Sequence, residues 1–234
     1  MLEVHGLHAF RGPAHVLRGV YLTVAQGEIV GLVGRNGAGK TTTLESIMGL
    51  LPVRAGRVVF RDQEITHLPA HRRARLGIGY APEDCGLFPD LTVAEHLAIG
   101  TWMASRDQGH SQGRAELIHA LFPELHRLMQ RRALLLSGGE KKMLAIARAI
   151  ATSPSVLLLD EAFEGLAPVV VNRFAEAVKQ IKAAGISLLV AESNVRTAAR
   201  VADRMYVIDR GEILFCGPPE EVFRSEEVMR TIRG

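Results

Sequence analysis

The fold is decided by the stretch Gly34-Arg35-Asn36-Gly37-Ala38-Gly39-Lys40-Thr41-Thr42, which follows the apolar run Ile29–Val33. It matches the pattern G-x-x-x-x-G-K-S/T of a P-loop, in which glycines let backbone N–H groups turn inward around phosphate oxygens. Lys40 supplies a cation that reaches the terminal phosphates, and Thr41 offers a hydroxyl to Mg²⁺. A strand before the loop and a helix after it are the context that this motif requires. We therefore predict a nucleotide site, whereas a simple Gly-rich turn would leave Lys40, Thr41 and Thr42 unexplained.

Size and composition are those of an ordinary globular protein, with 234 residues of which 47% are hydrophobic. Such a chain can bury a substantial core. The longest apolar runs have about the length of a strand, and the N-terminus has no charged-then-apolar signal pattern, so we expect a cytoplasmic protein. Cys85 and Cys216 lie far apart and outside any zinc-ligand spacing, which predicts two reduced thiols.

The net charge is only +3. The basic residues are scattered in small groups such as Arg72-Arg73, without the interleaved aromatics of a nucleic-acid surface. We therefore expect these groups on solvated faces, and no nucleic-acid partner. A weakly basic surface also suits contact with anionic headgroups or with the cytoplasmic loops of a membrane partner.

The pattern of strands and helices predicts an α/β fold. Residues 2–9 and 16–24 read as N-terminal antiparallel strands. Residues 90–133 lack strand signals and open with a capping box at Thr92 and Glu95, which indicates helices around an exposed loop at 105–113. We expect a single domain over residues 1–234. Its P-loop NTPase core, with a parallel central sheet, would comprise residues 1–89 and 134–234, and an α-helical subdomain would be inserted at about 90–133.

A second candidate anion site is the turn Ser137-Gly138-Gly139-Glu140, which opens a helix-like segment. Free backbone N–H groups, a serine hydroxyl and a helix N-terminus converge there. Taken alone, the turn indicates only an N-cap. Its occurrence in a chain with a P-loop favours a phosphate-binding role.

Two adjacent carboxylates, Asp160 and Glu161, end the apolar run that begins at Val156. Such a run suits a central parallel strand, and the carboxyl ends of parallel strands lie on the side of the P-loop. Asp160 would then hold Mg²⁺, directly or through water, and Glu161 would orient and deprotonate the attacking water. The alternative is a strand end with two solvated acids, which we would prefer only without the P-loop.

Two further residues have an open interpretation. Ser193 follows another apolar strand on the same side of the sheet, where it could act on phosphate or simply cap the next helix. Phe10 is an aromatic residue upstream of the P-loop that could stack on a nucleotide base or belong to the core. Spacing alone does not separate these alternatives.

The P-loop, the sequence Leu-Ser-Gly-Gly-Glu at 136–140 and the strand ending in Asp160-Glu161, in this order, resemble the ATP-binding subunits of ABC transporters over nearly the whole chain. The resemblance implies an ATPase with ATP and Mg²⁺ as cofactors and Glu161 as catalytic base. It implies that Phe10 stacks on adenine and that Glu83 occupies the Q-loop position near the metal. It also implies a head-to-tail pair of subunits, in which the Ser-Gly-Gly signature of one completes the γ-phosphate site at the P-loop of the other.

The segments 77–83, 121–125, 143–148 and 164–168 are most similar to the shorter ATPase of branched-chain amino acid importers, and importers of urea or short amides look similar. The resemblance implies an energy-coupling subunit on the cytoplasmic face of the membrane. Its partners would be a second ATPase subunit (itself or a similar chain), transmembrane permease subunits and, indirectly, a solute-binding protein outside the cell membrane.

The chain departs from that family at two places. Ser193 stands at the switch position, where histidine is usual and this subgroup often has glutamine, and Ala162-Phe163 stand where proline and serine are frequent. These changes predict slow hydrolysis or dependence on a partner subunit, and they leave a non-catalytic regulatory subunit as an alternative. A soluble ABC ATPase acting on DNA or ribosomes would carry long coiled coils or tandem ATPase units, and a metabolic kinase would leave the signature without a role.

Overall fold

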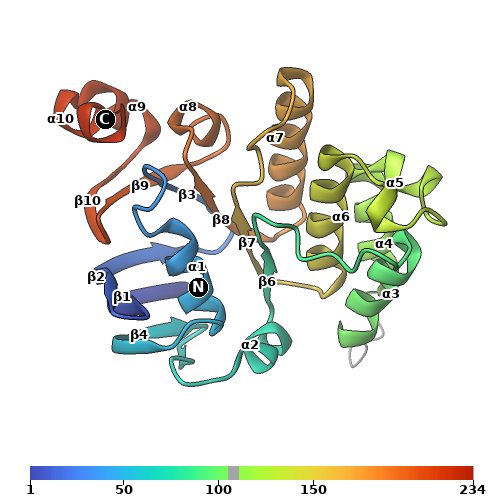
Figure 1. Cartoon of the computed structure of the whole chain (residues 1–234), viewed down its shortest axis with the longest axis horizontal. Helices are drawn as coiled ribbons and strands as arrows, with labels where there is room; N and C mark the ends of the chain where they lie inside the picture. Colours follow the sequence, from blue (N-terminus) through green and yellow to red (C-terminus); the bar gives the residue numbers. More distant parts are fainter. Residues whose placement is uncertain (105–110, 234) are drawn as a thin grey trace.

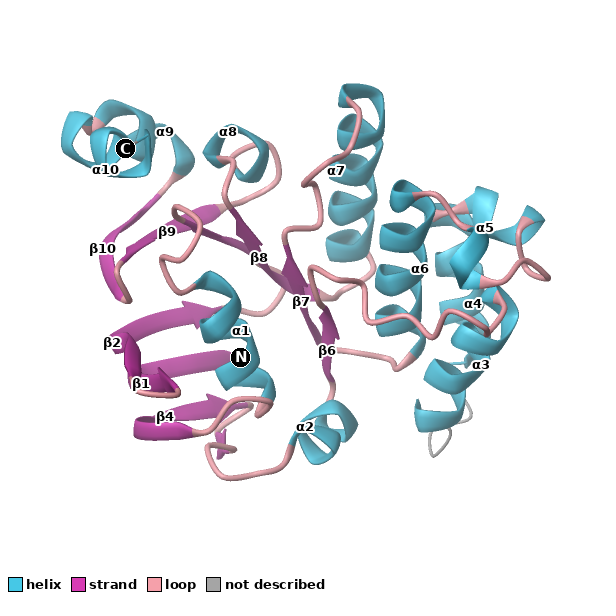
Figure 2. Cartoon of the chain, viewed as in Figure 1, coloured by secondary structure: helices cyan, strands magenta, loops and turns pink. Residues whose placement is uncertain are grey.

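The computed structural model describes residues 1–104 and 111–233, arranged as two sheets with helices around them (Figure 1, Figure 2). The strands are β1 (Leu2–Arg11), β2 (Ala14–Val24), β3 (Ile29–Val33), β4 (Val53–Phe60), β5 (Gln63–Glu64), β6 (Ile78–Ala81), β7 (Val156–Asp160), β8 (Ser187–Glu192), β9 (Arg204–Asp209) and β10 (Glu212–Gly217). The helices are α1 (Lys40–Met48), α2 (Ala70–Leu76), α3 (Val93–Ala104), α4 (Ser111–Leu121), α5 (Pro123–Arg127), the 3-10 helix η2 (Ala133–Leu135), α6 (Gly138–Ala151), α7 (Pro168–Ala183), α8 (Val195–Ala198), α9 (Pro219–Arg224) and α10 (Glu226–Arg233).

The two sheets have the expected character. The N-terminal sheet has the order β2-β1-β4-β5, and its neighbouring strands are antiparallel. The central sheet has the order β10-β9-β3-β8-β7-β6, and all its pairings are parallel except that of β10 with β9. The α/β fold with a parallel central sheet and N-terminal antiparallel strands is therefore confirmed.

The central strands are apolar because both of their faces are covered. Every residue of β7 is buried. Leu157 and Leu159 enter one core with α6 and α7, whereas Val156 and Leu158 enter a second core shared with α1 and the N-terminal sheet. Figure 1 shows α1 between the two sheets, with α6 and α7 beyond the central sheet. A continuous apolar run is what such a doubly covered strand requires.

Helices α3, α4 and α5 lie together beside α6, away from the N-terminal sheet (Figure 1). The capping box at the start of α3 is confirmed, since the Glu95 carboxylate accepts from the Thr92 N–H at 2.7 Å and the Glu95 N–H donates to the Thr92 hydroxyl at 3.2 Å. The limits of the expected subdomain, about 90–133, stay a prediction. Of the loop expected at 105–113, residues 105–110 lie outside the described residues. Its last three residues begin α4, so the helical pattern extends one turn earlier than expected.

One basic residue is not on a solvated face as expected. Arg73 is only 2% exposed, because its guanidinium donates to four carbonyl oxygens, those of Ser46, Ile47, Thr66 and Leu68. Two of these carbonyls belong to the last turn of α1, so Arg73 satisfies the C-terminal end of the P-loop helix. Its neighbour Arg72 is exposed.

Strand order brings three strand ends together. β8 lies between β3 and β7, and all three are parallel, with Val33 paired to Glu192 and Asp160 paired to Ala191. The chain segments that leave these strands therefore meet at one edge of the sheet. They are the P-loop, the Asp160-Glu161 pair and the segment beginning at Glu192.

Among the described residues, no helix is both long enough and apolar enough to cross a membrane. Cys85 is buried and Cys216 is exposed, and both are free thiols.

Candidate nucleotide site

The P-loop has the conformation that its glycines allow. A Cβ at Gly34 would lie 2.2 Å from the backbone oxygen of Ile208, so a side chain cannot fit there. Gly37 and Gly39 have φ values of 82° and 115°, in the left-handed region that favours glycine. Helix α1 begins at Lys40 without a side-chain cap, which leaves its first N–H groups available to an anion.

The other P-loop residues frame this turn. Arg35 and Asn36 are exposed at its rim, whereas Ala38 is buried and its N–H donates to the Arg35 carbonyl at 3.0 Å. Thr42 is buried, and its hydroxyl accepts from Nε of Arg11 at 3.1 Å. The predicted loop is thus assembled as one unit at the start of α1.

Lys40 is 5% exposed and lies at the centre of the loop. Its Nζ donates to the carbonyls of Gly34 at 2.9 Å and Arg35 at 3.2 Å, and it lies 3.1 Å from Oε1 of Glu161. A buried ammonium requires such partners, because desolvation would otherwise strongly disfavour its charge. The predicted phosphate-binding cation and the predicted base are therefore paired.

Glu161 is held from several sides. Its Oε2 accepts from both the N–H of Ser193 at 3.0 Å and the hydroxyl of Ser193 at 3.1 Å. Its own backbone has a φ of 46° and its carbonyl accepts a hydrogen bond from Nζ of Lys142. The structure thus brings Glu161 and Ser193 into direct contact. Ser193 does not cap α8, because the N-cap is Asn194, whose side chain accepts from the Thr197 N–H at 3.2 Å.

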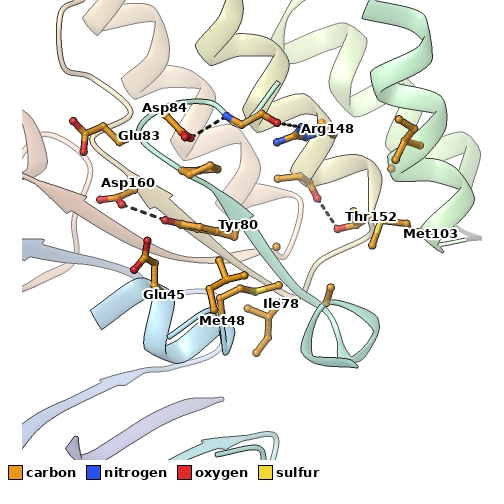
Figure 3. Close-up of a pocket in the computed structure, with 18 of the residues that line it drawn as sticks. Glu45, Met48, Ile78, Tyr80, Glu83, Asp84, Met103, Arg148, Thr152 and Asp160 are labelled. Atoms are coloured by element: carbon orange, nitrogen blue, oxygen red, sulfur yellow. Dashed lines mark hydrogen bonds between the residues drawn. The ribbon is translucent and has the colours of Figure 1, made fainter. Parts of the chain in front are cut away.

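Asp160 is 1% exposed at the end of β7. Its Oδ1 accepts from the Thr41 hydroxyl at 3.2 Å. Its Oδ2 accepts from the Tyr80 hydroxyl at 3.3 Å (Figure 3). Burial raises the pKa of Asp160 to about 6, partly offset by these two hydrogen bonds. Glu83, the third predicted metal residue, is exposed and lines the same pocket as Thr41 and Asp160.

These oxygen donors fit a hard cation such as Mg²⁺, which takes one or two protein carboxylates and completes its shell with phosphate oxygens and water. Among residues 1–104 and 111–233, no group of three or more His, Cys, Asp or Glu is placed to hold a metal by itself. A cation at Asp160 and Thr41 would therefore need a bound phosphate as a further ligand.

The signature turn forms the N-terminus of α6. Ser137 is its N-cap and forms a capping box, in which the Ser137 N–H donates to Glu140 at 2.7 Å and the Glu140 N–H donates to the Ser137 hydroxyl at 3.3 Å. Ser137 and Gly138 are exposed, and a Cβ on Gly138 would meet nothing within 4 Å. These hydrogen bonds are local to the turn, and its surface is open.

Phe10 lies near the end of β1, half-buried on the side of the strand opposite the buried Ala9. Its ring stacks on that of His15, with centroids 4.3 Å apart and planes 4° from parallel. The next residue, Arg11, ties this end of β1 to the P-loop helix through Thr42 and an ion pair with Glu45.

Glu192, the last residue of β8, has a role that the sequence did not indicate. Glu192 is 1% exposed, and its Oε1 accepts from the Phe163 N–H at 3.0 Å. Burial, together with the neighbouring Glu161, raises the pKa of Glu192 to about 8. Its signal in the sequence was a carboxylate directly after an apolar strand, the same signal that identified Asp160.

A groove of about 1010 Å³ extends from Thr41 and Asp160 toward the helices (Figure 3). Its lining includes apolar side chains of α1 and α3 and of the segments beside them, namely Met48, Leu50, Phe88 and Met103, together with the acids Glu83 and Asp84. Arg148 of α6 fixes the loop at its edge by donating to the carbonyls of Cys85 at 3.0 Å and Gly86 at 2.6 Å.

Known proteins are similar to this chain in sequence and in fold. The family described as ABC transporter matches residues 17–164. The lipopolysaccharide export system ATP-binding protein LptB of Escherichia coli strain K12 is 37% identical over 228 residues, covering 97% of this chain and 93% of LptB. A probable ABC transporter ATP-binding protein of Azorhizobium caulinodans is 38% identical over 235 residues, covering 100% of this chain and 83% of that protein. Among solved structures, the ADP conformation of an ATP-binding cassette of an ABC transporter has a TM-score of 0.84 at 27% identity, covering 100% of this chain and 98% of the other.

The chain belongs to the ABC transporter family, and within it to the ATP-binding subunits. It is an ATPase with the ABC ATPase fold, as the sequence predicted. These relatives do not support the narrower expectation of a branched-chain amino acid importer, because the one with a named transport system belongs to an exporter.

Proposed function

We propose that this chain binds Mg²⁺-ATP at Lys40 and hydrolyses it with Glu161 as the general base, so that the reaction powers an ABC transporter. The observation that carries the proposal is the cluster of the buried Lys40 and Glu161 with the half-buried Ser193, on the chain segments that follow three adjacent strands. A phosphate-binding cation and a carboxylate able to accept a proton from water thus lie within one hydrogen-bonded unit.

In this mechanism the γ-phosphate of ATP replaces the Glu161 carboxylate beside Nζ of Lys40. The uncapped N–H groups of α1 hold the phosphate oxygens. Glu161 keeps its hydrogen bonds to Ser193, which orient the carboxylate so that it can accept a proton from the attacking water. When bound, Mg²⁺ would be held by Asp160 and Thr41, with Glu83 at the rim, and would neutralise charge on the phosphates.

The working unit that we propose is a head-to-tail pair of ATPase subunits. The signature turn supports it, because the hydrogen bonds of Ser137 stay within the turn and Ser137 and Gly138 are exposed to a second subunit. ATP would favour the closed pair only by the contacts that form there. The second subunit is another copy or a similar chain, and size measurement of the purified protein with ATP tests the first case.

The proposed membrane partner is the permease, with the ATPase bound peripherally at the cytoplasmic face. The groove beside Glu83 supports this docking, because its apolar and acidic lining suits an amphipathic segment with basic residues. Since the groove begins at Thr41 and Asp160, movement around the nucleotide would reach the docked segment directly.

Two proposals for the cargo rest on different observations. The motifs at 77–83 and 164–168 favour import of branched-chain amino acids or related small polar solutes, with a solute-binding protein. The similarity to LptB favours export of lipopolysaccharide. To separate them, the native membrane complex would be purified through this chain and its ATPase activity measured. Stimulation by a solute-binding protein loaded with leucine supports import, and stimulation by lipopolysaccharide supports export.

A regulatory subunit without hydrolysis remains the alternative to the ATPase role within a complex. It would bind ATP and dimerise, yet release no phosphate even with its permease present. The intact Asp160 and Glu161 pair favours the catalytic role.

A further inference from the structure

Three aromatic rings gather on the outward side of the N-terminal sheet, beside the P-loop helix. They belong to His8, Phe10 and His15, and Phe10 and His15 are direct partners in the pairing of β1 with β2. The ring of Phe10 stacks on that of His15 at 4.3 Å and 4°. The ring of His15 is in turn hydrogen-bonded to that of His8, with Nδ1 of His8 3.1 Å from Nε2 of His15.

This cluster is separate from the core of the sheet. Leu7 and Ala9 point into the core and are fully buried, whereas His8 and Phe10 alternate with them and are half-buried on the other side. His8 lies over Gly19 of the neighbouring strand, where a Cβ would be 3.6 Å from its Nε2. The rings are therefore packed mainly against one another rather than into a core.

Mutual packing restricts how Phe10 can lie. A half-buried phenylalanine on a strand otherwise retains rotamer freedom, which a ligand must remove on binding. Parallel stacking on His15 fixes the plane of the Phe10 ring, and the bond to His8 fixes the plane of the His15 ring. A hydrogen bond between two imidazoles needs a donor on one ring and an acceptor on the other, so it also selects the tautomers of the pair.

We propose that His15, held by His8, is a positioning residue for the base of the nucleotide. It backs one face of Phe10, so that the opposite face is presented to adenine in a fixed orientation. The proposal rests on the proposed function, in which Phe10 stacks on adenine. It adds that the base site consists of three side-chain rings, those of Phe10, His15 and His8, rather than of Phe10 alone.

The test compares two ligands, ATP and inorganic tripolyphosphate, which lacks the base. Dissociation constants are measured by calorimetric titration for the wild type, His15→Ala, His15→Phe and Phe10→Ala, and the fold of each variant is checked by thermal melting. His15→Ala should weaken ATP binding about three- to tenfold, the scale of one aromatic pair, and leave tripolyphosphate binding unchanged. His15→Phe keeps a ring behind Phe10 and should restore most of the ATP affinity.

A matched control is His5→Ala, on the same strand. His5 contacts Glu3 and the ring of Tyr21 rather than Phe10, so its removal should change neither dissociation constant. In a Phe10→Ala background, His15→Ala should have no further effect on ATP, because its contribution passes through Phe10. The turnover number at saturating ATP should stay at the wild-type value in His15→Ala, with only KM raised.

Three results would overturn the proposal. Unchanged or tighter ATP binding by His15→Ala would mean that the histidine does not support the base site or that it competes with adenine. Equal weakening of ATP and tripolyphosphate would mean a general structural effect. An ATP affinity unaffected by Phe10→Ala would mean that Phe10 does not stack on adenine. Because such a variant still binds ATP, that result would refute this proposal without refuting the proposed ATPase function.

Discussion

Lys40 and Glu161 form a buried ion pair, with Nζ and Oε1 separated by 3.1 Å and each side chain 5% exposed. The cation that would bind the γ-phosphate and the carboxylate that would activate water thus neutralise each other. In the proposed mechanism, each residue exchanges this partner when a nucleotide enters. The pair connects stability to function, because either residue alone would be a buried charge without compensation.

Removing Lys40 should therefore have two effects. Lys40→Ala should abolish tight ATP binding and also lower the free energy of unfolding, by about 3 kcal/mol, because Glu161 loses its ionic partner. The double variant Lys40→Ala/Glu161→Gln should regain stability without regaining ATP affinity. Denaturant unfolding and calorimetric titration measure the two quantities. ATP affinity equal to that of the wild type in Lys40→Ala would refute the phosphate assignment.

The Ser193 hydroxyl should contribute modestly to turnover. Ser193→Ala removes one of two hydrogen bonds to Oε2 of Glu161 and keeps the backbone N–H bond, so kcat should fall about three- to tenfold with ATP affinity unchanged. Ser193→His, the residue usual at this position in the resembled family, should raise kcat above that of the wild type because it reaches further toward the phosphate. A phosphate-release assay measures both. A rise in kcat for Ser193→Ala would show that the serine restrains Glu161 instead.

Glu192 should make stability depend on pH. Its pKa is raised from an ordinary 4.5 to about 8, so between these values the folded protein holds a proton that the unfolded chain has lost. The stability contributed by this group is complete below about pH 4.5 and declines as pH rises toward 8.

Glu192→Gln removes this titration while keeping an oxygen that can accept from the Phe163 N–H. The melting temperature of the variant should accordingly fall less than that of the wild type between pH 5 and pH 9, in buffers of equal ionic strength. Parallel melting curves over this range would contradict the assignment of a buried, protonated Glu192.

Arg73 should be a major support of the P-loop helix. Burial lowers the pKa of its guanidinium to about 10, so it stays charged at neutral pH while it donates to four carbonyls. Arg73→Ala should lower the free energy of unfolding by about 3 kcal/mol, since several buried carbonyls lose their donors. Arg73→Lys keeps the charge but not the planar fork, and should recover only part of the loss. Arg72→Ala, at an exposed neighbour, is the control, and equal melting temperatures for all variants would contradict this role.

Much of the fold was predictable because it rests on local chemistry. The glycines of the P-loop, the capping box at Thr92 and the apolar run ending at Asp160 each require a particular backbone, and the structure has it. Asp160, Glu161 and Ser193 lie beside the P-loop because β7 and β8 are parallel to β3 and end at the same edge of the sheet.

Contacts between distant residues were not predictable in the same way. The ion pair of Lys40 with Glu161 joins residues that are far apart in sequence, and no spacing rule encodes it. The burial of Arg73 depends on carbonyls from two segments distant in sequence, the end of α1 and the turn before α2, and its place beside Arg72 suggested a solvated face instead. The stack of Phe10 on His15 depends on the register of two strands, which residue types alone do not determine.

The central claim is tested most directly by measuring Mg²⁺-ATP hydrolysis of the purified chain beside Glu161→Gln, with particle size followed in the same samples. We expect the wild type to release phosphate and the variant to be slower by about 100-fold or more, the scale of a general base, while an ATP-bound dimer accumulates. A Glu161→Gln variant that hydrolyses ATP at the wild-type rate and remains monomeric with ATP would contradict both the catalytic role of Glu161 and the shared site.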